Sequence, residues 1–264
     1  MNDTSPGRIK TRFAVVNGQR YEAQPSLSGK CQLCDRPMVA KCGEVRIWHW
    51  AHQGGCSCDR WWENKTEWHR KWQAEFPDAW QEIVRHAETG EKHIADVKTD
   101  RDWVIEFQHG YLKPQERRYR DAFYRKVIWV VDGTRRKKDV AQLLSAWNEG
   151  APVGANSLLR RAFSDNCTLL REWAGNTPIL FDLGEPELLW WLLATSTKGA
   201  YLTPYSRARF IESHRAGGAA DAAREFDEFV NDIPKLVANW ESQLRAQSLQ
   251  DPLALRPPRR SFRF

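Results

Sequence analysis

The clearest alternation of apolar and polar positions is WVIEFQ, which extends from Trp103 to Gln108. Successive side chains of a strand point to opposite faces, so Ile105 and Phe107 share one face while Glu106 and Gln108 share the other. The pattern predicts a strand that buries a large apolar face. Glu106 and Gln108 then lie side by side on the opposite face.

A second short strand, IADVK from Ile94 to Lys98, precedes it, and the polar turn 99–102 joins the two. Pairing of these strands can bring Asp96 close to Glu106. Two carboxylates on one sheet face repel each other unless a cation lies between them, and hard divalent cations such as Mg²⁺ take oxygen ligands of this kind. The pattern indicates either an ordinary hairpin with a solvated acidic face or a cation site.

The flanking patterns predict the order helix, three strands, helix, strand. The first helix begins at Asp59 as its N-cap and ends at Phe76 before a proline, and its tryptophans recur at helical spacing, which is typical of a packed face. Residues 79–86 alternate as a strand. Pro114 fits the first turn of the second helix, which extends to about residue 126, and VIWVV at 127–131 is a buried strand.

Glu67 lies on a different face of the first predicted helix from the tryptophans. Beside the hairpin, its carboxylate could add a ligand for a metal ion or for water. The alternative is a solvated helix charge. His69 cannot share the direction of Glu67, and it is either a packed histidine or one that faces the edge of a cleft.

Residues 31–58 contain five of the six cysteines and two of the seven histidines. Cys31 and Cys34 have the spacing of a zinc knuckle, and His49 and His52 can complete a tetrahedral site from one helical turn or a tight loop. Other cysteines in this stretch compete for the second pair of ligands; they are Cys42, Cys56 and Cys58. The set Cys31, Cys34, His49 and His52 therefore predicts a structural Zn²⁺, and the alternative is free cysteines and packing histidines.

The composition narrows the class of protein. The chain has 264 residues, 41% hydrophobic and 28% charged, as expected of a globular protein. Its net charge of +6 permits a polyanion such as nucleic acid as a partner. It has no apolar run of about 18 residues and no apolar signal-peptide core at its start. A cytoplasmic location without membrane contact is expected, where cysteines serve as metal ligands or thiols more often than as disulfides.

Three regions are predicted along the chain. Residues 1–58 hold a hairpin, with strands at 12–16 and 21–22 around the turn Asn17-Gly18, and the zinc module. Residues 59–133 form the core described above. Residues 134–264 form a mainly helical extension, with a strand and turn at 176–184 and a helical pattern that breaks near Pro234.

Two basic segments of this extension have open interpretations. The run from Arg135 to Lys138 is either a solvated face or a phosphate contact. Residues 252–264 combine four arginines with prolines, which predicts a disordered basic tail that can bind nucleic acid.

Seven short motifs together resemble one protein family; they are Cys31-x2-Cys34, His49-Trp-Ala-His52, Glu67-Trp-His69, Ile94-Ala-Asp96-Val, Trp103-Val-Ile-Glu106-Phe-Gln108-His109, Arg120-x2-Phe123-Tyr124 and Ile128-Trp-Val-Val-Asp132-Gly133. In this order and spacing they resemble the competence protein CoiA-like family, which has a PD-(D/E)XK nuclease-like core. The resemblance covers roughly residues 28–133, about 40% of the chain.

This resemblance implies an α/β fold of restriction-endonuclease type, with an αβββαβ core, and a Mg²⁺- or Mn²⁺-dependent nuclease that hydrolyses phosphodiester bonds in DNA. Asp96 and Glu106 take the positions of the metal ligands, and Glu67 matches the helix carboxylate. Gln108 falls where the superfamily usually has a lysine, so it can orient a water molecule but brings no positive charge. The expected DNA contacts are Arg117, Arg120, Lys98 and His109.

The implied setting is DNA uptake, recombination and repair, or defence against foreign DNA, with further proteins of DNA processing as possible partners. Because Gln108 replaces the usual lysine, a second hypothesis is a catalytically degenerate, zinc-containing DNA-binding adaptor. A third is a zinc protein that only scaffolds other proteins.

Overall fold

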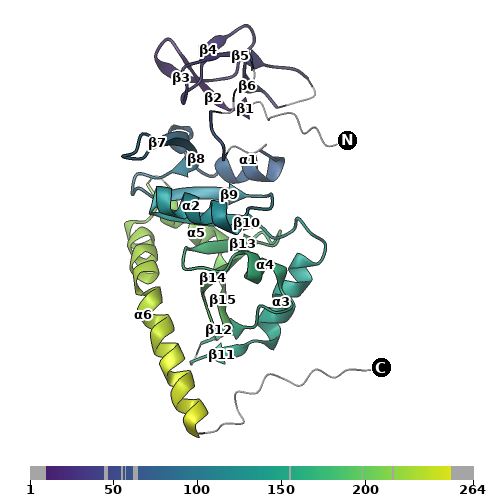
Figure 1. Cartoon of the computed structure of the whole chain (residues 1–264), viewed down its shortest axis with the longest axis vertical. Helices are drawn as coiled ribbons and strands as arrows, with labels where there is room; N and C mark the ends of the chain where they lie inside the picture. The colour runs from purple at the N-terminus through teal and green to yellow at the C-terminus, as the bar shows by residue number, and fades with distance from the viewer. Residues whose placement is uncertain are drawn as a thin grey trace. The chain divides into compact units, whose positions relative to one another are not determined.

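The structure, a computed structural model, divides the chain into two compact units, Met1–Asp132 and Gly133–Phe264 (Figure 1). It describes residues 10–44, 47–54, 56, 58–61, 65–154, 156–197, 199–215 and 217–250. These residues form a mixed α/β protein. The boundaries predicted within the first unit stay a prediction.

The first unit begins with an antiparallel six-stranded sheet of order β1-β6-β5-β4-β2-β3. Its strands are β1 (Lys10–Thr11), β2 (Phe13–Val16), β3 (Gln19–Glu22), β4 (Ser28–Lys30), β5 (Pro37–Lys41) and β6 (His49–His52). The predicted hairpin is confirmed, because β2 pairs with β3 and the turn residues Asn17 and Gly18 both have positive φ, at 50° and 79°. Two-residue turns of this kind match the twist of paired strands.

The core of this sheet is small. Trp50 and Met38 are fully buried in it, and the indole Nε1 of Trp50 donates to the carbonyl of Tyr21 at 2.9 Å. Cys31 lies in the same cluster. A core this small gains rigidity from any metal ion that crosslinks its loops.

The rest of the first unit follows the predicted order of elements. These are α1 (Glu67–Gln73), a short 3₁₀ turn at Asp78–Trp80, β7 (Gln81–His86), β8 (Lys92–Lys98), β9 (Val104–Gln108), α2 (Pro114–Tyr124) and β10 (Val127–Asp132). The strands lie in the order β10-β9-β8-β7. The strand pairs β7–β8 and β8–β9 are antiparallel, whereas β9 and β10 run parallel because α2 carries the chain back between them.

Both faces of β9 and of β10 are buried. Glu106 and Gln108 are only 4% and 3% exposed, so the interpretation of their face as a solvated acidic surface is wrong. The opposite face agrees with the sequence pattern, because Phe107 packs against the ring of Trp72 on α1 at a centroid distance of 5.7 Å.

The first helix begins later than predicted. Its N-cap is Thr66, whose hydroxyl accepts from the amide of His69 at 3.3 Å. Asp59 is instead buried, and it accepts from the amides of Trp61 and Ile94 at 2.9 Å each and lies 2.8 Å from His93 Nδ1. A carboxylate held by a distant strand fixes a loop, so no helix begins there. Residues 62–64 lie outside the described residues.

The second unit contains more sheet than predicted. Its strands lie in the order β11-β12-β15-β14-β13. They are β11 (Ala151–Val153), β12 (Asn156–Ala162), β13 (Ile179–Asp182), β14 (Leu188–Ser196) and β15 (Gly199–Ser206). The strand predicted within 176–184 is confirmed as β13, but the prediction of a mainly helical extension missed the others. β14 is an unbroken apolar run buried on both faces, and such a run lacks the alternation that identifies a strand.

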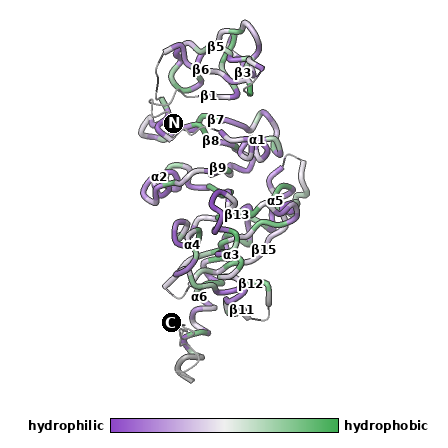
Figure 2. Tube along the Cα trace, turned by 90° about the vertical axis from the view of Figure 1, so that its right-hand side faces the viewer, coloured by the Kyte–Doolittle hydropathy of each residue, from purple (hydrophilic) through white to green (hydrophobic). Residues whose placement is uncertain are grey.

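The helices of this unit are α3 (Asp139–Glu149), α4 (Thr168–Glu172), α5 (Arg207–His214) and α6 (Ala220–Gln250). The expected break near Pro234 is wrong, because α6 continues through it. Phe226 stacks on Trp191 at 5.1 Å and holds the first half of the helix on β14, which offsets the hydrogen bond that proline removes. Figure 2 shows polar and apolar positions mixed along α6.

The two basic segments have different outcomes. In the run 135–138, Arg136 pairs with Asp139 at 2.7 Å and with Glu172 at 2.7 Å, so its charge is used within the fold. The predicted tail at 252–264 lies outside the described residues. No described helix is long and apolar enough to cross a bilayer.

We expect Asp59→Ala to lower the free energy of unfolding by about 2–4 kcal/mol, because it leaves buried amides of Trp61 and Ile94 without their acceptor. Urea unfolding followed by tryptophan fluorescence measures this loss. The exposed Asp100→Ala is the matched control and should stay within about 0.5 kcal/mol of wild type. Equal stabilities of the two variants would show that the Asp59 contacts do not hold this loop.

Candidate active site and candidate metal centre

Three carboxylates lie in a row across the antiparallel strands of the first unit. Val97 lies opposite Ile105, so one step further along the two strands places Asp96 opposite Glu106. On the other side, Glu82 lies between the paired residues Gln81 and Ile83 of β7, with a left-handed backbone (φ 49°), and its side chain lines the same pocket. Directly opposite residues of antiparallel strands share a face. Glu82, Asp96 and Glu106 are all buried, at 1%, 8% and 4% exposure.

Backbone amides and buried cations hold this row together. The amide of Phe107 donates to Asp96 Oδ2 at 3.0 Å, and the amide of Asp96 donates to Glu106 Oε1 at 3.3 Å. Lys65 Nζ lies 3.0 Å from Glu82 Oε1 and 3.1 Å from Asp96 Oδ1. Arg120 reaches Glu106 Oε2 at 3.5 Å. The lysine side chain is only 8% exposed, so its charge acts in a site with little water to screen it.

Two further side chains complete the surroundings of Asp96 and Glu106. His69 Nε2 lies 3.0 Å from Asp96 Oδ1. Gln108 is buried beside Glu106 on β9, and its amide nitrogen donates to the carbonyl of Gly110 at 3.3 Å.

The surroundings drive the pKa values of the two central carboxyl groups apart. Burial opposes ionisation of Asp96, but the charges of His69 and Lys65 outweigh it and hold the pKa of Asp96 below its usual range. Burial, together with the negative charge of Asp96, raises the pKa of Glu106 to about 8. Burial alone lowers the pKa of Lys65, but the charges of Glu82 and Asp96 overcome this and leave it raised.

These groups open into one pocket of about 310 Å³. Its lining includes Lys65, His69, Gln108, His109 and Arg120 together with the three carboxylates. A concave site with convergent polar groups and shifted pKa values is typical of an active site.

Of the four residues predicted to act in catalysis, the structure brings together three: Asp96, Glu106 and Gln108. Glu67 lies outside the pocket; its side chain is 78% exposed and pairs with Lys71 at 2.9 Å, which lowers the pKa of Glu67. Its predicted role as the helix carboxylate has no support from this position. Glu67 faces outward and His69 faces Asp96, because residues two apart on a helix point in different directions.

The four residues predicted to contact DNA do not lie together in the structure. Arg120 and His109 line the pocket. Arg117 is buried, and its Nε lies 3.9 Å from Asp121 Oδ2. Lys98 does not line the pocket: it lies at the turn end of the hairpin, where Nζ is 3.2 Å from Asp102 Oδ1.

Sequence reasoning missed two members of the site. Glu82 has a left-handed backbone (φ 49°) that interrupts the alternation of β7, and only the tertiary structure shows that Lys65 joins it to Asp96. The same glutamate accepts from the amide of Arg12 at 2.8 Å, which links the six-stranded sheet to this row. Lys65 lies in a loop where the sequence predicts helix, so no periodic signal pointed to it.

The donor types of Asp96 and Glu106 fit a hard divalent cation. Both are carboxylates on neighbouring strands, and burial together with the charge of Asp96 raises the pKa of Glu106. A bound cation has to share Asp96 with Lys65 and His69. Outside the cysteine cluster described next, no group of three or more His, Cys, Asp or Glu ligand atoms converges within the described residues.

A separate set of ligands lies in the six-stranded module. One ligand atom from each of Cys31, Cys34, His52 and Cys58 lies within 4.8 Å of all the others, so this cluster could hold a structural metal such as zinc. Cys34 Sγ is 3.4 Å from His52 Nε2, and Cys31 Sγ is 3.7 Å from Cys58 Sγ. The hydrogen bond from Cys58 is the main cause that lowers the pKa of Cys31 to about 5, and thiolate is the form that binds zinc.

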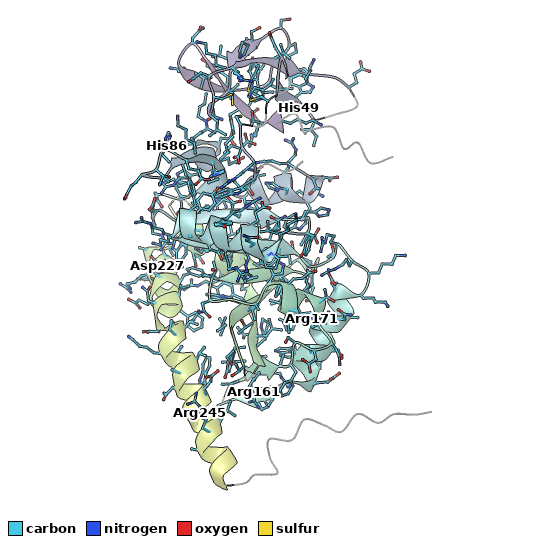
Figure 3. All side chains as sticks on the ribbon, viewed as in Figure 1. His49, His86, Arg161, Arg171, Asp227 and Arg245 are labelled. Carbon is cyan, nitrogen blue, oxygen red and sulfur yellow. The ribbon has the colours of Figure 1, made fainter. Side chains whose placement is uncertain are left out.

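This cluster corrects the predicted fourth ligand. The predicted Cys31, Cys34 and His52 converge, but His49 does not, and Cys58 takes its place. His49 and His52 lie on strand β6, where residues three apart point to opposite faces. His49 Nδ1 lies 2.9 Å from the carbonyl of Ile47 instead (His49 is labelled in Figure 3). The rivals Cys42 and Cys56 are not in the cluster, although Cys56 Sγ is 3.8 Å from Cys34 Sγ.

No family model, curated protein or solved structure matches this chain. The function is therefore inferred from the residues of the site.

We expect the purified protein to contain about one zinc ion per chain, bound by the four clustered residues. Cys58→Ala should lose this zinc and melt at a lower temperature, whereas His49→Gln should keep it. Metal analysis of the dialysed proteins and thermal melts measure both effects. Loss of zinc from the His49 variant with retention in the Cys58 variant would restore the ligand set predicted from sequence.

Stability should depend on pH through Glu106. A carboxyl group whose pKa is raised in the folded state stabilises the fold while it is neutral. This stabilisation is fully present below pH 4.5, the ordinary pKa of glutamate, and it is lost as the pH rises through about 8. Glu106→Gln stays neutral. With a chelator present, we expect it to gain stability over wild type as the pH rises from about 5 to 9.

Urea unfolding at each pH measures this difference. The exposed Glu88→Gln is the control, and its difference from wild type should not change with pH. A difference for Glu106→Gln that is constant across this range would refute the raised pKa.

Proposed function

We propose that the pocket hydrolyses phosphodiester bonds in DNA, and that residues from α1 to β10 form a PD-(D/E)XK-like nuclease core of the CoiA-like kind. One observation carries the proposal. Asp96, Glu106 and Gln108 face one pocket, and a buried cation, Lys65, lies against the same carboxylates. The order of elements supports it, since helix, three strands, helix and a parallel strand position these residues.

In the proposed reaction a water oxygen forms a bond to phosphorus, and the bond from phosphorus to a sugar oxygen breaks. The products are a phosphate monoester and an alcohol. Asp96 and Glu106 would hold a Mg²⁺ or Mn²⁺ ion, whose charge would activate water and offset negative charge on the phosphate. Gln108 orients the water through its side-chain amide.

Lys65 supplies the positive charge that Gln108 lacks. In this interpretation the ammonium reaches the phosphate from the loop before α1, and its raised pKa keeps it charged at neutral pH. Arg120 lines the same pocket but is already held by Glu116 at 2.6 Å and by the carbonyl of Trp61 at 2.8 Å. We therefore assign the contact with the scissile phosphate to Lys65, and a supporting role to Arg120.

The zinc-binding module has a structural role in this proposal. Four protein ligands leave no open position on a tetrahedral zinc ion, so the module brings rigidity and surface, and no chemistry. The net charge of +6 supports attraction of the DNA backbone, which should weaken as salt rises.

A second candidate is the catalytically degenerate DNA-binding adaptor, and one observation favours it. Lys65 and His69 already balance Asp96, so the carboxylates have partners without a metal ion. The two candidates differ in metal binding. If the site is catalytic, Mn²⁺ should raise the melting temperature of the wild-type protein but not that of Asp96→Asn. If the protein is an adaptor, Mn²⁺ should not raise the melting temperature of either.

We expect the full chain to cleave DNA in Mg²⁺ or Mn²⁺ and the variants Asp96→Asn and Lys65→Met to lose at least about 100-fold in rate. The test uses a panel of labelled single-stranded and double-stranded DNA and RNA. Glu67→Gln is the matched control, since its carboxylate lies outside the pocket, and it should stay within about twofold of wild type.

Two results would contradict the proposal. One is cleavage that persists unchanged in Asp96→Asn, which would indicate a contaminating nuclease. The other is salt-sensitive DNA binding without cleavage under any metal condition, which would establish the adaptor. Salt-insensitive or absent binding would favour the scaffold.

A further inference from the structure

His109 and Asp132 form a pair at the pocket. His109 Nδ1 lies 2.6 Å from Asp132 Oδ2, and the aspartate side chain is 3% exposed whereas the histidine side chain is 40% exposed. The parallel register explains the pair. Val131 of β10 lies opposite Gln108 of β9. The next residues, Asp132 and His109, therefore lie close together where the two strands end.

The contact with Asp132 decides which nitrogen of His109 faces the substrate. A carboxylate accepts the Nδ1 proton, so the neutral ring carries its lone pair on Nε2. Among the described residues none is hydrogen-bonded to Nε2, and His109 lines the pocket. The ring of Trp68 on α1 lies 6.3 Å away and limits its rotation. The result is an oriented, partly exposed proton acceptor.

The other candidate bases of the pocket already have partners within the fold. Asp96 and Glu106 are engaged by backbone amides and cations. Burial raises the pKa of Tyr124 well above its usual value, so it stays neutral. Gln108 does not titrate. His69 directs Nε2 at Asp96.

We propose that His109 is the general base of the proposed hydrolysis, and that Asp132 is its positioning residue. The inference rests on the proposed function. As the water oxygen forms its bond to phosphorus, one O–H bond of the water breaks and the proton passes to His109 Nε2. The bond to the leaving sugar oxygen breaks, that oxygen takes a proton from solvent, and His109 returns its proton to solvent. This role replaces the DNA contact expected for His109.

The charged groups around His109 come from several elements of the first unit. Asp132 faces it from β10, and the titratable and charged groups that share its pocket are Asp59, Lys65, His69, Glu82, Asp96, Glu106, Arg120 and Tyr124. A general base accepts a proton only in its unprotonated form, so the wild-type kcat should rise with pH.

The test compares wild type, His109→Ala and Asp132→Asn as full chains on the best substrate of the cleavage panel. We expect His109→Ala to lose about 100-fold or more in kcat and to lose the acidic limb of its pH profile. Its DNA affinity, measured by fluorescence anisotropy, should stay within about twofold. Added imidazole should restore His109→Ala at least tenfold, because the removed side chain leaves room for it.

Asp132→Asn should also lower kcat at an unchanged KM, and imidazole should not rescue it, because the ring of His109 still fills the position. Thermal melts should show that both variants are folded. Wild-type cleavage with a full rate in His109→Ala would overturn this inference alone. A weaker DNA affinity at unchanged kcat would do the same and assign His109 to phosphate binding. No cleavage by wild type would refute the proposed function, and the base with it.

Discussion

The first unit depends on a row of three buried carboxylates that its own strands force together. Neighbouring strands β7, β8 and β9 bring Glu82, Asp96 and Glu106 to one pocket. Like charges so close, with little water, would be strongly destabilising if all were ionised and unpaired. Lys65 crosses between two of them and Arg120 approaches the third. The fold therefore needs the positive charges of Lys65 and Arg120 beside these carboxylates for its stability, independently of any chemical function of the site.

The same row connects elements that are distant in sequence. One oxygen of Glu82 meets Lys65 and the other accepts from the amide of Arg12 in the six-stranded module. The metal-ligand cluster of that module lies in a small core with few apolar residues. A tetrahedral metal there would stiffen the sheet that contributes this contact. The zinc cluster and the acidic row are thus parts of one unit, with separate chemistry.

Chemical roles follow from which side of each strand or helix a residue occupies. Gln108 occupies a strand position beside Glu106 but is neutral, and the loop before α1 supplies the cation instead. His109 gains a partner only because β9 and β10 are parallel and end together. Glu67 loses its expected place because its side chain faces away from the pocket and pairs with Lys71. Each difference comes from the direction or the position that the tertiary structure gives a side chain.

The sequence alone determined the order of elements from α1 to β10, the Asn17-Gly18 hairpin and the closeness of Asp96 and Glu106, because these depend on short-range alternation and turn chemistry. It also determined three of the four clustered metal ligands. The tertiary structure decided the fourth, since His49 and His52 point to opposite faces of a strand, while Cys58, six residues after His52, reaches the cluster. It likewise brought in Lys65, Glu82 and Asp132. Their places depend on strand register and loop path, which no local pattern encodes.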